Sequence, residues 1–177
     1  MSNIKQAMKG DKQAFVKVIE EHKLALYKVM KAILQNEDDV CDAMQETLIN
    51  IYKNISKLQS ERYFKTWATR IAINECYHII KKQKVNQDKI VKIQNNTSNE
   101  DMTLNKEIEK TDIEVAISKL DKELKIVVVM YYYNNLKVHD IAEVLEIPAG
   151  TVKSRLSRAR ESLYQNLKPE EVNVNEE

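Results

Sequence analysis

The sequence predicts an all-α protein, in which a flexible polar linker joins two small helical domains and the C-terminal domain contains a helix-turn-helix. Three observations support this prediction. Only two glycines and two prolines occur among 177 residues, which argues against turn-rich sandwiches, barrels and glycine-loop nucleotide folds. Hydrophobic residues make up 43% and charged residues 31% of the chain, as in proteins with a packed core. Apolar residues recur at three- and four-residue steps through most of the sequence, as in amphipathic helices.

The first domain is predicted over residues 1–83 as a series of amphipathic helices. Apolar residues at helical spacing from Phe15 to Ile33 indicate its first long helix. A second helix is expected after the stretch Asn36-Glu37-Asp38-Asp39, which offers turn and N-cap chemistry. A third is expected from about Tyr63 to Lys82.

Residues 84–111 are rich in Asn, Gln, Ser, Thr and Asp and have no sustained apolar period, which is typical of a flexible linker. The helical pattern resumes over 112–168, and the acidic tail 169–177 is expected to be disordered. Within the second domain, residues 126–133 are β-branched and aromatic and alone would favour a strand. A helix-forming stretch with Asp121 as a candidate N-cap precedes them, and this half offers no partner strand, so we predict a buried helix.

Residues 137–163 have the pattern of a helix-turn-helix: a short helix over about 138–145, a tight turn containing Pro148, and a longer second helix. The second helix divides into two sides at 100° per residue. Its apolar side consists of Val152, Leu156, Ala159 and Leu163.

The opposite side and flanks of this second helix carry short hydroxyl groups and long cations, which suit the major groove of DNA and its phosphates. A solvated face on a bundle helix is the alternative. Residues 148–168 contain five basic residues and a single acid, Glu161. Positive charge is therefore concentrated in this segment, although the net charge of the whole chain is only +1. The candidate DNA-binding residues are Thr151, Lys153, Ser154, Arg155, Ser157, Arg158 and Arg160.

The predicted 63–82 helix has one mostly apolar side and one side that mixes aromatic and cationic groups. Aromatic rings stack on unpaired bases and cations hold the backbone, so the mixed side suits single-stranded nucleic acid. Trp67 stands at its margin and also fits the core. The candidate residues are Tyr63, Trp67, Arg70, Asn74, Tyr77 and Lys81.

The second predicted helix carries an acidic face. Five acids lie between positions 37 and 46 with no base among them. This face is either solvated or meets a partner protein, where charge steers the encounter and apolar anchors hold it. The residues opposite the apolar stripe are Asp38, Asp42, Gln45, Glu46 and Ile49.

Two blocks of sequence resemble a known family. The string IAEVLEIPAGTVKSRLSRAR (141–160) resembles the promoter-reading region 4 of bacterial extracytoplasmic-function (ECF) sigma factors. In the first domain, DVCDAMQETLINIYKNI (39–55) resembles region 2.2, and FKTWATRIAINECYHIIKK (64–82) resembles regions 2.3 and 2.4. The blocks stand in the family's order, and together with the linker they cover most of the chain.

The resemblance implies an alternative sigma factor that directs core RNA polymerase to specific promoters, with no catalysis and no cofactor of its own. It implies that the 38–49 face docks on the polymerase, that the 63–82 face melts and reads the −10 element, and that the 151–160 face reads the −35 element. The implied partners are core RNA polymerase, promoter DNA (duplex at −35 and melted at −10) and an anti-sigma factor, which in this family is often membrane-anchored.

Three positions depart from the family pattern. Glu146 stands where many members have Gly, and a left-handed conformation there would cost about 1 kcal/mol. His78 and Lys81 replace a frequent Asp and Arg, which bears on the −10 sequence preference. One rival interpretation is a dimeric helix-turn-helix regulator, which leaves the 38–49 and 63–82 faces without roles. Another is a helical adaptor, which explains neither the basic residues of the second helix nor the turn before it.

No pattern predicts catalysis or a metal site. Cys41 and Cys76 lie far apart, and both are expected as buried thiols. His22, His78 and His139 have no ligand spacing. No apolar run reaches the roughly 18 residues of a membrane span and no signal peptide opens the chain, so we expect a cytoplasmic protein without membrane insertion.

Overall fold

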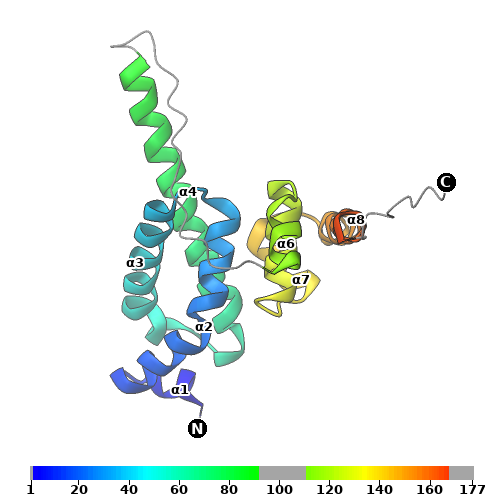
Figure 1. Ribbon diagram of the computed structural model, residues 1–177. Helices are drawn as coiled ribbons and strands as arrows, with labels where there is room; N and C mark the ends of the chain where they lie inside the picture. Colours follow the sequence, from blue (N-terminus) through cyan, green and yellow to red (C-terminus); the bar gives the residue numbers. More distant parts are fainter. Residues whose placement is uncertain (1, 92–110, 168–177) are drawn as a thin grey trace, which may run out of the picture.

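The computed structural model describes residues 2–91 and 111–167, and every regular element in these ranges is a helix (Figure 1). The all-α prediction is therefore confirmed for the described part of the chain. Most of the predicted linker (92–110) and the predicted acidic tail (169–177) lie outside the described residues.

The N-terminal half contains four α-helices: α1 (Asn3–Met8), α2 (Lys12–Ile33), α3 (Glu37–Asn54) and α4 (Phe64–Val91). Two short 3-10 turns, Ile55–Lys57 and Glu61–Tyr63, connect α3 to α4. Within the predicted capping stretch, Asn36 is the residue that caps α3, because its side-chain oxygen accepts the backbone N–H groups of Asp38 and Asp39. The core of this half is formed by fully buried side chains that include Val18, Met30, Val40, Ile51 and Phe64.

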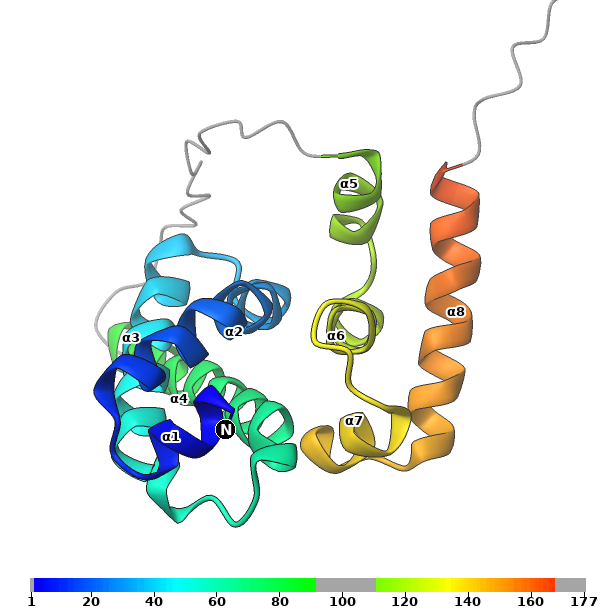
Figure 2. The same ribbon diagram turned by 90° about the horizontal axis from the view of Figure 1, so that it is seen from below.

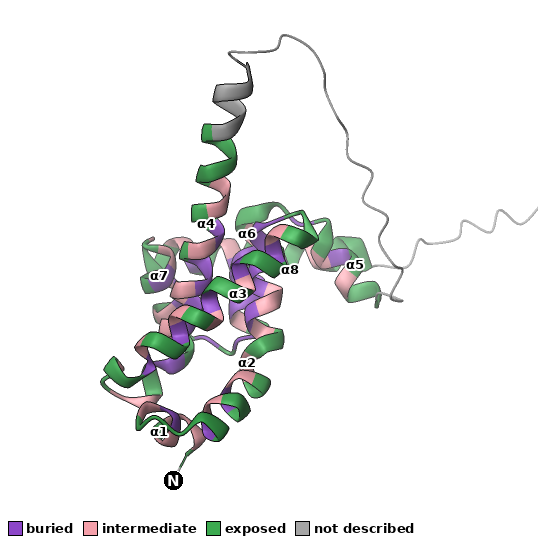
Figure 3. Cartoon of the chain, turned by 90° about the vertical axis from the view of Figure 1, so that its left-hand side faces the viewer, coloured by how far each residue is buried: buried purple, intermediate pink, exposed green. Residues whose placement is uncertain are grey.

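Helix α4 is longer than the sequence predicts. It continues from Phe64 to Val91, 28 residues in all, whereas its end was expected near Lys82. Residues 83–91 contain no glycine or proline to stop the helix. The side chains of residues 81–85 are exposed where this end of α4 projects beyond the bundle (Figure 3).

The C-terminal half contains α5 (Asp112–Ser118), α6 (Lys122–Tyr132), α7 (Val138–Leu145) and α8 (Ala149–Leu167). The predicted buried helix is α6, whose residues 126–130 are all buried, so tertiary packing overrides their preference for strands. Asp121 stands at its N-cap but makes no side-chain capping bond. Helix α5 is instead capped by Thr111, which exchanges reciprocal bonds with Glu114.

The two halves pack against each other. Helix α6 lies between α2 and α8, and α7 contacts α4 (Figure 2). The buried amide of Asn134 donates a hydrogen bond to the Thr69 hydroxyl at 3.1 Å. No local pattern predicts this contact, because it joins the loop after α6 to a residue of α4 that is distant in the sequence.

The two cysteines differ in their surroundings. Cys76 is buried, and this burial raises the pKa of its thiol to about 12. Cys41 is exposed, so the expectation of a buried thiol is wrong there. Cys41 directly follows the buried Val40 on α3, and successive side chains of an α-helix are rotated by about 100°, so Cys41 points away from the core. Among the described residues, no helix combines the length and apolar character needed to cross a membrane.

Candidate functional site

Helices α7 and α8 form the predicted helix-turn-helix. The turn between them depends on Glu146, which adopts a left-handed conformation (φ 54°, ψ 40°) and donates its backbone N–H to the carbonyl of Ala142. Ile141 of α7 and Val152 and Leu156 of α8 are buried, as the apolar stripe predicts. This packing fixes the orientation of α8 and leaves its opposite side in solvent.

The solvent side of α8 presents cations that make no internal contact. Lys153, Ser157 and Arg158 are exposed. Within the described residues, neither Lys153 nor Arg158 forms a hydrogen bond or an ion pair, so both are available to an external anion. The Ser154 hydroxyl donates to the Thr151 carbonyl one turn earlier, at 2.9 Å.

The other two arginines of α8 are held against α6. Arg155 is half-buried and forms an ion pair with Glu123. Arg160 donates from Nε to the Tyr132 hydroxyl, and this bond raises the pKa of the guanidinium. These contacts direct both side chains along the flank of α8 toward α6.

The candidate residues on α4 form one side of that helix. Asn74, Tyr77 and Lys81 are exposed, and none of the three forms a hydrogen bond or ion pair with another described residue. Tyr63 stands just before α4, with its hydroxyl accepting from Arg62. Trp67 is half-buried with its ring 6.1 Å from that of Phe64, so it belongs partly to the core.

Arg70 differs from its neighbours because it is already engaged. Its Nη2 donates to the backbone carbonyl of Glu143 at 2.8 Å and lies 3.2 Å from the Glu143 carboxylate. Beside this contact lies a cavity of about 850 Å³ between α3, α4 and α7. The cavity is lined by Trp67, Asn74, His139, Asp140 and other residues.

The three α7 residues on this cavity, His139, Asp140 and Glu143, were not predicted as site residues. No sequence signal could have found them, because their proximity to α4 arises only from the packing of the two halves.

The acidic face on α3 is exposed as predicted. Within the described residues, the three acids among its members have no hydrogen-bond or ion-pair partner for their carboxylates. All five side chains are solvent-accessible: Asp38, Asp42, Gln45, Glu46 and Ile49.

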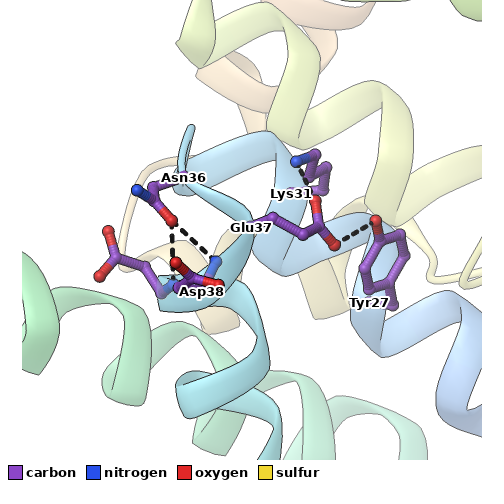
Figure 4. Close-up of polar contacts among 6 residues, drawn as sticks. Tyr27, Lys31, Asn36, Glu37 and Asp38 are labelled. Carbon is purple, nitrogen blue, oxygen red and sulfur yellow. Dashed lines mark hydrogen bonds and ion pairs between the residues drawn. The ribbon is translucent and has the colours of Figure 1, made fainter. Parts of the chain in front are cut away.

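The two remaining acids of the 37–46 segment are engaged internally. Glu37 accepts a hydrogen bond from the Tyr27 hydroxyl at 2.8 Å and pairs with Lys31 (Figure 4). Asp39 accepts from the Gln83 amide at 2.8 Å. The structure thus separates acids that hold α3 to α2 and α4 from acids left for a partner.

The Glu37 contacts also change the acidity of both partners. The Lys31 ammonium lowers the pKa of the Glu37 carboxyl, and the Tyr27 hydroxyl adds to this effect. Burial, with the nearby Glu37 carboxylate, raises the pKa of Tyr27 to about 12. Both shifts arise from the same group of contacts, which joins the C-terminal part of α2 to the start of α3.

The described residues contain no cluster of three or more His, Cys, Asp or Glu side chains that could hold a metal ion. What they present is three faces: unpaired cations on α8, mixed aromatic and polar groups on α4, and unpaired acids on α3. The first two suit nucleic acid and the third suits a protein.

Comparisons with known proteins match both halves of the chain. The family model described as sigma-70 region 2 matches residues 18–85, and the model described as sigma-70, region 4 matches residues 110–163. The chain is 33% identical over 178 residues to the ECF RNA polymerase sigma factor SigW of Bacillus subtilis, covering 93% of this chain and 95% of that protein. It is 26% identical to the ECF RNA polymerase sigma-E factor of Haemophilus influenzae, covering 94% of each.

Two solved structures share the fold. CnrH, in complex with the cytosolic domain of CnrY, aligns with a TM-score of 0.62 and 21% identity, covering 92% of this chain and 93% of that one. The sigma factor RpoE from Bartonella quintana, in complex with the anti-sigma factor NepR, aligns with a TM-score of 0.65 and 20% identity, covering 87% and 98%.

Proposed function

The chain belongs to the ECF sigma factors of bacterial RNA polymerase, and from this membership we propose how its three faces divide the work. The protein is an alternative sigma factor that directs RNA polymerase to promoters. It supplies recognition and strand opening, while the polymerase supplies the chemistry of RNA synthesis. It acts in the cytoplasm, where the polymerase works.

The −35 element is bound by the region 4-like domain, residues 112–168, through α8. Lys153 and Arg158 support this assignment, because both cations are exposed and unpaired. Arg155 and Arg160 lie on the flank and suit phosphates beside the groove, where orientation matters more than base identity. Thr151, Ser154 and Ser157 supply short hydroxyl groups between them.

The −10 element is bound by the region 2-like domain, residues 1–83, through α4. Asn74, Tyr77 and Lys81 form an exposed series in which a ring can stack on an unpaired base and a cation can hold the backbone. Tyr63 and Trp67 flank the cavity beside this series. Capturing unpaired bases offsets the few kcal/mol needed to unstack them, which favours the open strand.

The polymerase is bound by the exposed acidic face of α3. Asp38, Asp42 and Glu46 lack internal partners, so their charges are not neutralised before docking. Ile49, with 43% of its surface exposed, provides an apolar anchor in the same face. The separation of this face from the DNA faces lets one molecule bind both partners.

An anti-sigma factor is the proposed inhibitor. Two proteins of similar fold, CnrH and the Bartonella quintana RpoE, are seen in complexes, the latter with a protein named as an anti-sigma factor. An inhibitor of this chain would need to cover at least one of the three faces.

One observation carries the proposal: the chain combines unpaired cations on a helix-turn-helix with unpaired acids on a separate α-helical domain. A dimeric operator-binding regulator has no use for the second feature. Permanganate footprinting of a promoter with sigma alone, core polymerase alone and both together tests the mechanism. Reactive thymines near −10 are expected only with both, and reactivity with sigma alone would favour an autonomous DNA-binding regulator.

A further inference from the structure

Helix α1 lies against the connection between α3 and α4, which consists of residues 55–63 (Figure 2). Ala7 of α1 is buried, and the Asn3 amide donates a hydrogen bond to the Glu21 carboxylate of α2 at 2.9 Å. A helix of six residues is too short to be stable alone in water, so α1 depends on these contacts for its structure. The N-terminal helix is therefore fixed to the domain on the side where the chain enters α4.

The connection forms one wall of the cavity beside the −10 candidates. Four of its residues line this cavity together with Trp67 and Asn74 of α4: Lys57, Leu58, Gln59 and Tyr63. Among the described residues, neither of the two 3-10 turns in the connection has a side-chain capping bond. Local capping therefore does not hold this wall in place, and contacts from other elements do.

Glu61 is the residue through which α1 holds the connection. Its Oε2 accepts a hydrogen bond from the Ser2 hydroxyl, and its Oε1 lies 3.4 Å from the Lys5 ammonium. Ser2 is also the N-cap of α1, and its hydroxyl accepts the backbone N–H of Lys5 at 3.3 Å. The Ser2 hydroxyl and the Lys5 ammonium both lower the pKa of the Glu61 carboxyl. Both carboxylate oxygens are thus engaged by the start of α1.

The position of Glu61 determines the position of Tyr63. The two residues begin and end the same three-residue 3-10 turn, and the backbone N–H of Phe64, which starts α4, donates to the Glu61 carbonyl. The backbone N–H of Tyr63 donates to the Ser60 carbonyl at 3.1 Å. Because the turn is so short, a displacement of Glu61 moves Tyr63 with it.

We propose that α1 is a positioning element for −10 recognition, which holds Tyr63 and the 57–63 wall of the cavity, through Glu61, in the geometry that receives the unpaired strand. This inference rests on the proposed role of α4 at the −10 element. Glu61 is a positioning residue, because it does not line the cavity and acts through Tyr63. The α3 face that is proposed to bind the polymerase takes no part in these contacts.

Loss of the Glu61 contacts should weaken binding of the −10 strand and leave polymerase docking unchanged. An affinity is reduced by the fraction of molecules that hold the binding geometry. If the released wall holds that geometry in about a tenth of the molecules, the affinity for the strand falls about tenfold.

The experiment uses the holoenzyme formed from core RNA polymerase and the full-length chain. The probe is a fluorescent single-stranded DNA that the parent holoenzyme selects from a pool of random sequence, after strands that bind core polymerase alone have been removed. Glu61→Ala should bind this probe about tenfold more weakly than the parent, and Lys5→Ala should also bind it more weakly. Both variants should co-purify with core polymerase as the parent does.

Two further variants separate the contact from a general loss of folding. Lys9 is exposed at the end of α1 and forms no ion pair within the described residues, so Lys9→Ala is the matched control for Lys5→Ala and should bind as the parent does. The exchange Lys5→Glu with Glu61→Lys rebuilds the ion pair with reversed charges and should recover most of the lost affinity. Amide hydrogen exchange over residues 55–63 should be faster in Glu61→Ala and close to parental in the exchange variant.

Parental affinity in Glu61→Ala would overturn the inference. So would weaker binding that the charge exchange does not recover, or that Lys9→Ala reproduces, because the effect would then not come from this contact. A parent holoenzyme that selects no strand from the pool would overturn the proposed role of α4, and the inference with it. The two failures are distinct, because the first appears only in the variants and the second already in the parent.

Discussion

Arg160 donates a hydrogen bond from Nε to the Tyr132 hydroxyl across 3.0 Å, and this bond connects helix α8 to the buried helix α6. The guanidinium also lies 5.8 Å from the centre of the Tyr131 ring. Lys153 and Arg158 have no comparable contact among the described residues. The basic residues of α8 therefore fall into an oriented pair on the flank and an unpaired set on the exposed side.

The first prediction concerns the exposed set. Arg158→Ala and Lys153→Ala should weaken −35 binding by the holoenzyme. A lost base contact should cost about 1–3 kcal/mol and relax sequence preference, whereas a lost phosphate contact should weaken all sequences and reduce the salt dependence. Binding to intact and mutated −35 duplexes at several salt concentrations measures both effects. Gln165→Ala, exposed further along α8, is the control, and unchanged binding for both variants would remove them from the site.

The second prediction concerns the acidic face of α3. Asp42→Lys combined with Glu46→Lys should abolish holoenzyme assembly, because it reverses two exposed charges that no internal partner offsets. Co-purification with core polymerase measures assembly, and circular dichroism checks that the helices remain. Glu20→Lys with Glu21→Lys reverses two exposed acids on α2, which contact Lys23 and Asn3 within the same half, and should assemble normally. Assembly at the parental affinity would show that the α3 face is an ordinary solvated surface with no role in docking.

The third prediction concerns pH and Tyr27. Its pKa is about 12 in the folded protein against 10.0 for an ordinary tyrosine, so the unfolded chain releases this proton first. The resulting stability is complete below pH 10 and is lost as the pH rises toward 12. Urea unfolding from about pH 9 to about pH 11 should therefore show a shallower loss of stability in Tyr27→Phe. A slope in Tyr27→Phe equal to that of the parent would contradict the assignment.

The fourth prediction concerns the turn between α7 and α8. Glu146 has a φ of 54°, which side chains rarely adopt and glycine adopts freely. Glu146→Gly should raise the free energy of unfolding by about 1 kcal/mol. Asn135 has a similar φ of 52°, but asparagine tolerates this region, so Asn135→Gly should gain less. Thermal unfolding of both variants compares them, and a larger gain at Asn135 would argue against strain at Glu146.

Local patterns predicted most of the secondary structure. The helix-turn-helix bounds, a cap within residues 36–39 and the buried α6 follow from spacing, capping chemistry and the absence of a partner strand. Glu146, where many family members have Gly, is left-handed in the structure. The predicted end of α4 comes too early, because the polar composition is typical of a linker although nothing in residues 83–91 stops a helix.

The sequence predicts which residues share a helix face better than it predicts which residues they contact. Periodicity identifies which side chains share a helix face, and the exposed members of the α3, α4 and α8 faces lie as expected. It cannot show that Arg70 meets Glu143, or that Glu37 and Asp39 are engaged internally while Asp42 is not. Those relationships depend on how whole helices pack, which no local pattern encodes.

Helix α6 packs against α2 on one side and α8 on the other, and its residues 126–130 are almost entirely apolar and buried. If the halves separate, the side of α6 that faced α2 becomes exposed to water. Exposed apolar surface of this kind promotes aggregation unless another molecule covers it. A form of the protein in which the two halves are separated should therefore be less soluble than the packed form. Without the polymerase or an inhibitor to cover this surface, aggregation of the separated form is avoided only while the halves stay packed.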